Sequence, residues 1–242
     1  MDLLLGTLAL RPYVFAFLGC FLAAGALDLG WRRTLLFGAW VWPLAWLSEF
    51  SSTRVGVPFG LYHYTGLTRG RELFLANVPL MDPLSFTFLA YASFCVARAA
   101  LGRRAGPWRL ALLGGVLMML LDVVIDPLAV RGERWFLGRI FYYPDGGVYF
   151  GVPLSNFAGW FIVGALGIGG YLLMVGAAMG GRPTGGIALY YAVLAFNLAI
   201  TAWIGEWPML FVGLLLHSAV IAALCVVRRW PVAWPGLESQ KA

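Results

Sequence analysis

The segment MMLLDVVIDPLAV, from Met118 to Val130, places two aspartates in a long apolar run. Asp122 and Asp126 are four residues apart, which puts them on the same face of a helix, one turn from each other. A carboxylate in the membrane core costs roughly 2.5–3.5 kcal/mol on insertion scales, so such residues are candidates for function. In general, burial raises the pKa of a carboxyl group, and a second carboxylate nearby raises it further. One member of such a pair can stay protonated at neutral pH and act as a general acid.

A protonated carboxylic acid beside an apolar cavity can deliver a proton to an alkene. The tertiary cation that results would be stabilised by carboxylates and by aromatic faces, and 16% of the residues are aromatic. Other chemistries lack their residues. The single lysine, Lys241, is in the C-terminal tail and cannot form a retinal-type Schiff base, and two distant histidines do not make a zinc or iron site. We therefore expect no metal and no cofactor.

Sequence motifs of other enzyme classes are missing or incomplete. There is no GxSxG, no P-loop and no HExxH. The segment DVVID has the DxxxD spacing with which membrane prenyltransferases hold magnesium diphosphate, but no second aspartate-rich motif accompanies it.

The composition is that of an integral membrane protein. Of 242 residues, 61% are hydrophobic and 12% are charged, whereas soluble domains are about 45–50% apolar and about 25% charged. We expect a single transmembrane domain over residues 1–242, an all-α polytopic bundle of about seven helices of about 20 residues each. The predicted spans are 12–30, 34–50, 80–101, 108–128, 153–179, 185–204 and 207–227. Residues 1–10 are interpreted as an interfacial lead-in.

The basic residues between the spans predict the orientation of the chain. One side of the membrane receives Arg32, Arg33, Arg98, Arg103, Arg104, Arg109, Arg182, Arg228, Arg229 and Lys241. The other side receives Arg11, Arg54, Arg69, Arg71, Arg131, Arg134 and Arg139. The positive-inside rule places the first, larger group in the cytoplasm of a multi-pass cell-membrane protein, with the N-terminus outside and the C-terminus inside. Because the arginines serve this purpose, the net charge of +6 does not indicate nucleic-acid binding.

Two long loops, 51–79 and 129–152, fall on the outer face in this topology. Both are rich in glycine, proline and aromatic residues, as in VGVPFGLYHYTG and GRIFYYPDGGVYFGVPLSN. Irregular backbone at membrane depth is tolerated only where it is buried in protein or lines a cavity. We expect these loops to fold back over the bundle as a lid.

The predicted helices bring their polar residues to one level, in the outer half of the bundle. The residues at this level are Glu49, Asp82, Asp122, Asp126, Ser155, Asn156, Asn197, Thr201 and Glu206. Only one carboxylate, Asp28, is predicted near the cytoplasmic ends, where it neighbours Arg32. Because intramembrane ionisable residues are functional candidates, this clustering predicts a site beneath the lid.

These residues also have purely structural interpretations. Asp82 precedes Pro83, as an N-cap residue precedes a proline at the first helical position. Asp126 precedes Pro127 and could simply end its helix. The other structural alternatives are an ion pair of Asp122 with an arginine, an ion pair of Glu49 with Arg54, an interfacial position for Glu206, a loop-interface position for His63 and a packing role for His217.

Four segments, taken in order, carry a family resemblance. They are LSEFSSTRVGVPFGLYHYTG, VPLMDPLSF, LDVVIDPLAVRGERWFL and YYPDGGVYFGVPLSNFAGWF. Together they resemble the membrane carotenoid hydratase family over about residues 45–162, and the ends of the chain match only as apolar spans. The ordered set is fairly specific, whereas any one segment alone would be weak.

The resemblance implies hydration of the terminal C=C of an acyclic carotenoid end, such as that of lycopene, γ-carotene or a C50 precursor, to a tertiary alcohol. It implies a carotenoid and water as substrates in a lipid bilayer, without a redox cofactor. Carried over to this sequence, Asp126 or Asp122 would donate the proton, and the second aspartate or Glu49 would deprotonate the water. Asp82 and Asn156 would complete the polar end of the substrate site. The residues expected to line the cation pocket or the lid are Tyr62, His63, Tyr142, Tyr143 and Trp160.

Three other functions fit parts of the pattern. A lycopene-type cyclase would share the protonation step but capture the cation with an internal double bond. A proton-coupled transporter would use the aspartates as a relay, although the inner half of the bundle has few polar residues. A carotenoid- or lipid-binding protein would need the aspartates only for structure. Small residues such as Ala165 and Gly169 suit helix packing within a chain or in a homo-oligomer.

Overall fold

The computed structural model describes residues 2–102, 105–176 and 181–229, with side chains described as far as residue 226 in the last helix. Arg103, Arg104 and Lys241, which contribute to the predicted orientation, lie outside the described residues, as does the end of the predicted span 153–179.

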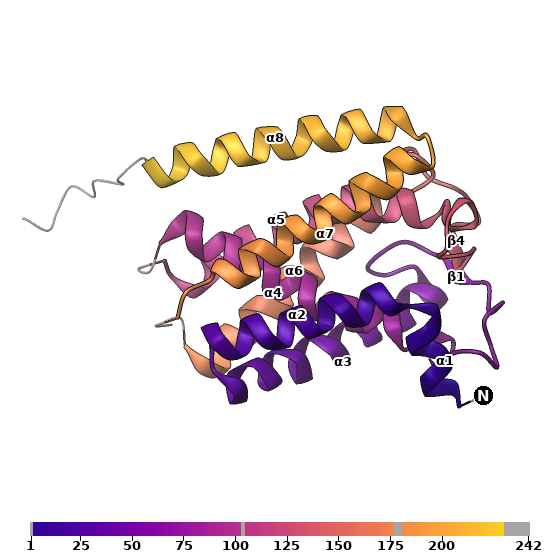
Figure 1. The fold of residues 1–242 in the computed structure, drawn as a ribbon, viewed down its shortest axis with the longest axis horizontal. Helices are drawn as coiled ribbons and strands as arrows, with labels where there is room; N and C mark the ends of the chain where they lie inside the picture. The colour runs from indigo at the N-terminus through magenta and orange to yellow at the C-terminus, as the bar shows by residue number, and fades with distance from the viewer. Residues whose placement is uncertain (1, 103–104, 177–180, 230–242) are drawn as a thin grey trace, which may run out of the picture.

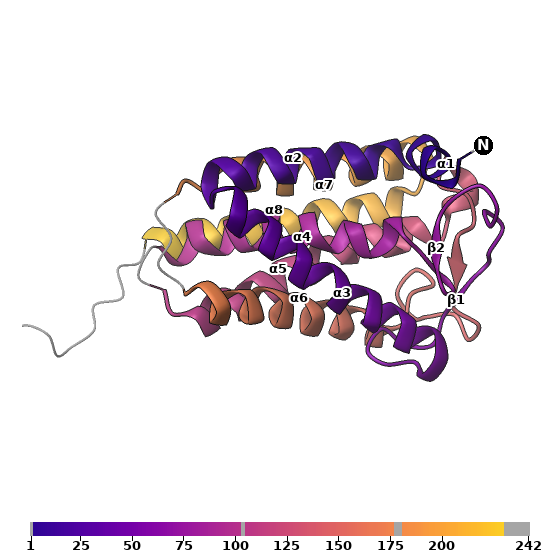
Figure 2. The ribbon, with the colours of Figure 1, turned by 90° about the horizontal axis from the view of Figure 1, so that it is seen from below.

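Eight α-helices make up most of the described chain, and all but α1 lie roughly along its long axis (Figures 1 and 2). They are α1 (Leu3–Leu10), α2 (Pro12–Asp28), α3 (Trp31–Val55), α4 (Met81–Leu101), α5 (Pro107–Ala129), α6 (Leu154–Val175), α7 (Thr184–Trp203) and α8 (Trp207–Arg229). Short elements interrupt the two long loops. They are β1 (His63–Tyr64), β2 (Phe74–Leu75) and β3 (Val78–Pro79) in the first loop, and the 3-10 turn η1 (Gly132–Arg134) and β4 (Phe141–Tyr142) in the second.

The all-α polytopic membrane bundle is confirmed, and each of the seven predicted spans overlaps one of the helices α2 to α8. Five of the described helices, α4 to α8, are long and apolar enough to cross a membrane. Helices α1 and α2, bent by 90° at their junction, count as a sixth span if they are taken together. Helix α3 is long but does not meet the same criterion, so the length and composition of the helices support five or six spans rather than seven.

Helix α4 is the centre of the bundle and is buried along most of its length, whereas α8 lies at the edge (Figure 1). The closest helix pair is α5 and α6. A Cβ added to Gly115 of α5 would lie 2.7 Å from the carbonyl oxygen of Phe161 and 2.9 Å from the backbone nitrogen of Ala165. Gly169 also faces α5, with Ala111 at 3.4 Å from its added Cβ. Ala165 and Gly169 therefore serve packing within the chain.

The two long loops meet at one end of the bundle, which confirms that they lie on the same side. Strands β1 and β4 pair antiparallel, with His63 opposite Tyr142 and Tyr64 opposite Phe141. Strands β2 and β3 form a small hairpin within the first loop. Figures 1 and 2 show this layer of loops capping the helix ends.

A buried ion pair fixes the N-terminus to both loops. Arg11 lies at the bend between α1 and α2 and is almost fully buried. Its Nη2 lies 3.3 Å from an oxygen of Glu72 in the first loop, and its Nη1 donates a hydrogen bond of 2.6 Å to the carbonyl of Leu137 in the second. The predicted interfacial lead-in is thus helix α1, and the residue that follows it holds the lid.

Candidate functional site

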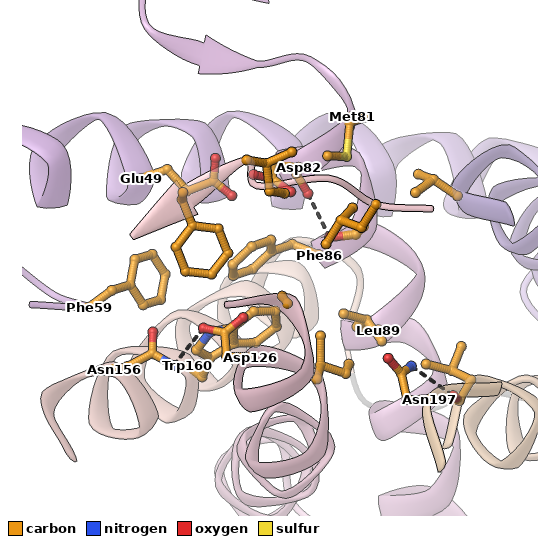
Figure 3. A pocket seen from close by; sticks show the side chains of 18 of the residues that line it. Glu49, Phe59, Met81, Asp82, Phe86, Leu89, Asp126, Asn156, Trp160 and Asn197 are labelled. Atoms are coloured by element: carbon orange, nitrogen blue, oxygen red, sulfur yellow. Dashed lines mark hydrogen bonds between the residues drawn. The ribbon is translucent and has the colours of Figure 1, made fainter. Parts of the chain in front are cut away.

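A cavity lies beneath the loop layer, where six helices and both loops provide its walls. Most of the lining is apolar and aromatic. The polar groups lie on two facing walls. Figure 3 shows Glu49 and Asp82 on one side of the cavity and Asp126 and Asn156 on the other. The cavity therefore combines an apolar interior with a small number of carboxyl, amide and hydroxyl groups, as binding sites for small molecules commonly do.

One side-chain amide bridges the two aspartates of α5. Nδ2 of Asn156, in the first turn of α6, lies 2.7 Å from Oδ2 of Asp122 and 2.7 Å from Oδ2 of Asp126. An amide NH2 group has two hydrogens, so it can donate one to each carboxyl group. Asp126 lines the cavity, whereas Asp122 is 0% exposed and lies one turn deeper. The other oxygen of Asp122, Oδ1, is buried and has no hydrogen-bond partner.

Asp126 does not end its helix. Helix α5 continues through Pro127 to Ala129, so the structural alternative in which Asp126 simply ends its helix is wrong, and the predicted span 108–128 is confirmed. The preference of a residue before proline for extended backbone is only a bias. Here the proline lies in the last turn, where the cost of one missing backbone hydrogen bond is small in comparison with continued packing.

Asp82 does not cap α4. The helix begins at Met81 with Leu80 as the preceding residue, and no side-chain hydrogen bond caps it. Asp82 therefore lies inside the first turn, with its side chain on the cavity wall. The structural alternative of Asp82 as an N-cap is therefore wrong, whereas the predicted span 80–101 begins within one residue of the helix.

Glu49 binds a tyrosine rather than an arginine. The Tyr64 hydroxyl donates a hydrogen bond of 3.0 Å to Oε2 of Glu49, and the Tyr62 hydroxyl lies 3.4 Å from that of Tyr64. The expected partner, Arg54, instead donates to Asn77 at 2.8 Å. A helix places residues five apart on different faces, and Glu49 faces inward. Burial raises the pKa of Tyr62 and of Tyr64 well above the usual 10, so both phenols keep their protons.

The carboxyl groups of the cavity have no ion-pair partners in the described part of the chain. The ion pairs found there use Asp28, Glu72 and Glu206. Asp28 pairs with Arg98 rather than with its neighbour Arg32, and Glu206 binds Arg131 and Arg134 at the loop end. Within the same described ranges, no three His, Cys, Asp or Glu side chains are grouped so as to hold a metal ion.

Aromatic rings surround the polar groups. Trp160 of α6 stacks on Phe86 of α4 with ring centroids 4.1 Å apart and an interplanar angle of 14°. Phe59 of the first loop contacts both rings, at 5.7 Å from Phe86 and 6.2 Å from Trp160. Tyr143 of the second loop lies 5.8 Å from Tyr62. A cation formed in this cavity would face several π systems.

Comparison with known proteins places the chain in a family. The family model described as "Carotenoid biosynthesis protein" matches residues 1–221. This chain belongs to the carotenoid biosynthesis protein family. One curated relative, the bisanhydrobacterioruberin hydratase of Haloarcula japonica, is 32% identical over 173 residues, which is 69% of this chain and 56% of the relative. The match thus spans a little over half of that relative's length. No solved structure matches the chain.

Most of the predicted site residues lie together in the structure. Those that line the cavity are Glu49, Asp82, Asp126, Asn156, Tyr62, Tyr143 and Trp160. Asp122 lies behind them and reaches the site through Asn156. His63 and Tyr142 face each other across β1 and β4 with ring centroids 5.9 Å apart and are not part of the cavity wall. They belong to the lid layer.

Several residues that line the cavity were not predicted from the sequence. Tyr64 is the hydrogen-bond partner of Glu49, and Phe59 and Phe86 form the aromatic wall with Trp160. All three belong to segments that carry the family resemblance, so the signal was present, but nothing in their spacing distinguishes them from interface aromatics. His217 has the packing role expected of it and lies 3.0 Å from the carbonyl oxygen of Leu120.

Proposed function

We propose that this chain is a hydratase that adds water across the terminal C=C of an acyclic carotenoid end, with lycopene, γ-carotene or a C50 precursor as the substrate class. The observation that carries the proposal is the Asn156 bridge between Asp122 and Asp126 at the wall of an aromatic cavity. Membership of the family and the printed activity of the curated relative support a role in carotenoid hydration.

Asp126 is the proton donor in this proposal. It faces the cavity, whereas Asp122 is enclosed, so only Asp126 can reach a substrate carbon. The two carboxyl groups share the Asn156 amide as their hydrogen-bond donor, and two neighbouring carboxyl groups without a cation partner are compatible with a single negative charge shared between them. Asp126 transfers its proton to the CH carbon of the terminal double bond, and the positive charge develops on the carbon that bears two methyl groups.

Aromatic faces and the remaining carboxylate charge stabilise this tertiary cation. Trp160 and Phe86 provide a stacked pair beside Asp126 and Asn156 (Figure 3). Ring faces attract cations most strongly where water is excluded. Asp122 contributes as a positioning residue, because Asn156 orients both carboxyl groups at once.

Glu49 accepts the proton from water on the opposite wall. A water molecule attacks the cation, a C–O bond forms, and one water proton moves to Glu49 while the other stays on the tertiary alcohol. Tyr64 holds Glu49 in place through its hydroxyl, and Asp82 adds a second oxygen acceptor on the same wall. Asp126 loses one proton and Glu49 gains one, so exchange with bulk water resets both groups and the net reaction adds one water.

The site would lie at the outer side of the membrane. The positive-inside rule puts the loop end of the bundle outside, with the N-terminus on that side and the C-terminus in the cytoplasm. Water would enter from the loop side, and the apolar substrate would enter from the bilayer.

Product analysis in a lycopene-producing host tests the proposed activity. Pigments from cells with and without this gene are separated by liquid chromatography and weighed by mass spectrometry. A hydratase gives new pigment heavier by one or two waters. New pigment of unchanged mass would show cyclisation instead and overturn the proposal.

Variants of the aspartates locate the acid in the same experiment. Asp126→Asn keeps the shape of the side chain but removes the acid, and we expect no hydrated pigment from it. Asp145→Asn is the matched control, because Asp145 is an exposed loop aspartate outside the cavity. Full activity of Asp126→Asn in well-expressed protein would contradict the assignment.

A further inference from the structure

The cavity has an apolar arm that runs between α2 and α7. Tyr13, Val14 and Phe17 line it from α2, and Val193 and Phe196 line it from α7. This part of the lining comes from other helices than Glu49 of α3 and Asp126 of α5, and its three rings, Tyr13, Phe17 and Phe196, are only partly buried. A reaction that uses only the end of a long polyene needs a place for the rest of the molecule.

Helices α2 and α7 are in close contact at one end and separated by aromatic rings at the other. Near the inner end, a Cβ added to Gly185 would lie 2.8 Å from the Cβ of Ala24. Near the loop end, the Phe196 ring stacks on Tyr13 at 5.3 Å and meets Phe17 edge-on at 5.7 Å. Side chains rather than close backbone contacts therefore close the wall at this point.

At this point the barrier between the cavity and the outside consists of aromatic side chains. Tyr13, Phe17 and Phe196 line the cavity but are only partly buried. Phe136, which is 52% exposed, packs on Tyr13 at 5.6 Å and on Phe196 at 6.3 Å from the outer side. Rotation of such side chains takes far less time than helix movement.

Two other walls of the cavity are closed. Helices α5 and α6 approach so closely that a Cβ on Gly115 would meet the backbone of α6. The loop end is covered by the β1–β4 pair and held by the ion pair of Arg11 with Glu72. An apolar polyene would also have to leave the bilayer to enter from the loop side.

We propose that Tyr13, Phe17 and Phe196 form a lateral gate between α2 and α7, through which a linear polyene passes from the bilayer with its chain in the apolar arm and its end at Asp126. This inference rests on the proposed function for the identity of the substrate. The gate opens by rotation of the three rings, and the close contact between Ala24 and Gly185 holds the inner ends of the helices together.

A reversible crosslink tests the gate. Phe17→Cys and Phe196→Cys are combined in a chain in which Cys20, Cys95 and Cys225 are replaced by alanine, and a short bifunctional thiol reagent with a reducible link joins them. The reconstituted protein is given lycopene before crosslinking, after crosslinking and after reduction. We expect hydration to be lost on crosslinking and restored by reduction. The single-cysteine variants, treated with the same reagent, should keep the rate that each had before treatment.

Binding separates failure of the gate from failure of the proposed reaction. Quenching of tryptophan fluorescence by the bound polyene reports entry without turnover. Slower association of the polyene with the crosslinked protein would support the gate even if none of the proteins made product. A complete lack of product would refute the proposed hydratase activity but not the gate. Unchanged association and unchanged hydration in the fully crosslinked protein would overturn the gate.

Discussion

The amide nitrogen of Asn156 lies 2.7 Å from a carboxyl oxygen of Asp126 and joins α6 to the acidic face of α5. The same nitrogen lies 2.7 Å from Asp122. One residue thus sets the position of the group that faces the cavity and of the group behind it. The geometry makes Asn156 the positioning residue for the proposed acid.

Replacement of Asn156 should damage both stability and turnover. Asn156→Leu keeps the volume of the side chain but leaves two buried carboxyl groups without their donor, which costs about 1–3 kcal/mol for an unsatisfied buried group. We expect a lower unfolding temperature in detergent and loss of most hydration activity. Asn77→Leu is the control, because Asn77 lies in the loop and binds Arg54. An Asn156→Leu protein with normal turnover would show that the bridge is not needed.

Loss of the Tyr64 hydroxyl should slow the reaction more than loss of the Tyr62 hydroxyl. Tyr64→Phe removes a hydrogen bond to a carboxylate, an interaction worth about 1.5–3 kcal/mol, so we expect kcat to fall by roughly tenfold to a hundredfold. Tyr62→Phe removes only the longer contact of 3.4 Å to Tyr64. The two variants are compared by their initial rates of lycopene hydration in proteoliposomes. Equal rates would show that the Tyr64 hydroxyl does not contribute to the reaction through Glu49.

The close packing of α5 on α6 should be required for the bridge. Gly115→Ala places a methyl group against backbone atoms of α6 at 2.7 and 2.9 Å, so the helices must separate. Overpacking of this kind costs about 1–3 kcal/mol, and it would move Asp126 relative to Asn156. Gly169→Ala, on the same interface, meets Ala111 at an ordinary 3.4 Å and should be tolerated. Thermal unfolding and turnover, measured on both variants, should fall only for Gly115→Ala.

The buried ion pair of Arg11 with Glu72 should hold the lid. Arg11→Met leaves Glu72 buried without its partner, and breaking a buried pair in this way costs about 3–5 kcal/mol. We expect a large fall in the unfolding temperature and faster proteolysis of the loop around Glu72. Arg11→Met combined with Glu72→Met should recover much of the loss, because no charge is then left unpaired. If the double variant is no more stable than the single one, the pair is not the cause.

The sequence predicted the positions of the helices better than it predicted the partners of their polar side chains. Hydropathy located all seven long helices, and the spacing of Asp122 and Asp126 placed both on one face, because these are local properties of the chain. Hydrogen-bond partners are set by tertiary packing. Glu49 therefore binds Tyr64 rather than the nearby Arg54, and Asp28 binds Arg98 rather than Arg32.

Two structural alternatives drawn from local rules were wrong. An aspartate before proline could have capped a helix at Asp82 or ended one at Asp126, whereas the predicted spans 80–101 and 108–128 agree closely with α4 and α5. The structure begins α4 at Met81 and carries α5 through to Ala129. In both places the aspartate lies on the cavity wall, where burial and packing outweigh the local preference. The pairing of Arg11 with Glu72 has no sequence signal, since 61 residues separate them.

The most direct test of the account is the fate of labelled water in the reaction. Purified protein in liposomes is given lycopene in water enriched in oxygen-18, and the product of the original chain is compared with that of Asp126→Asn by mass spectrometry. The account predicts one labelled oxygen in each tertiary alcohol from the original chain, and no alcohol from Asp126→Asn although it still binds the polyene. Labelled alcohol formed by Asp126→Asn at the original rate would contradict the assignment of Asp126 as the proton donor.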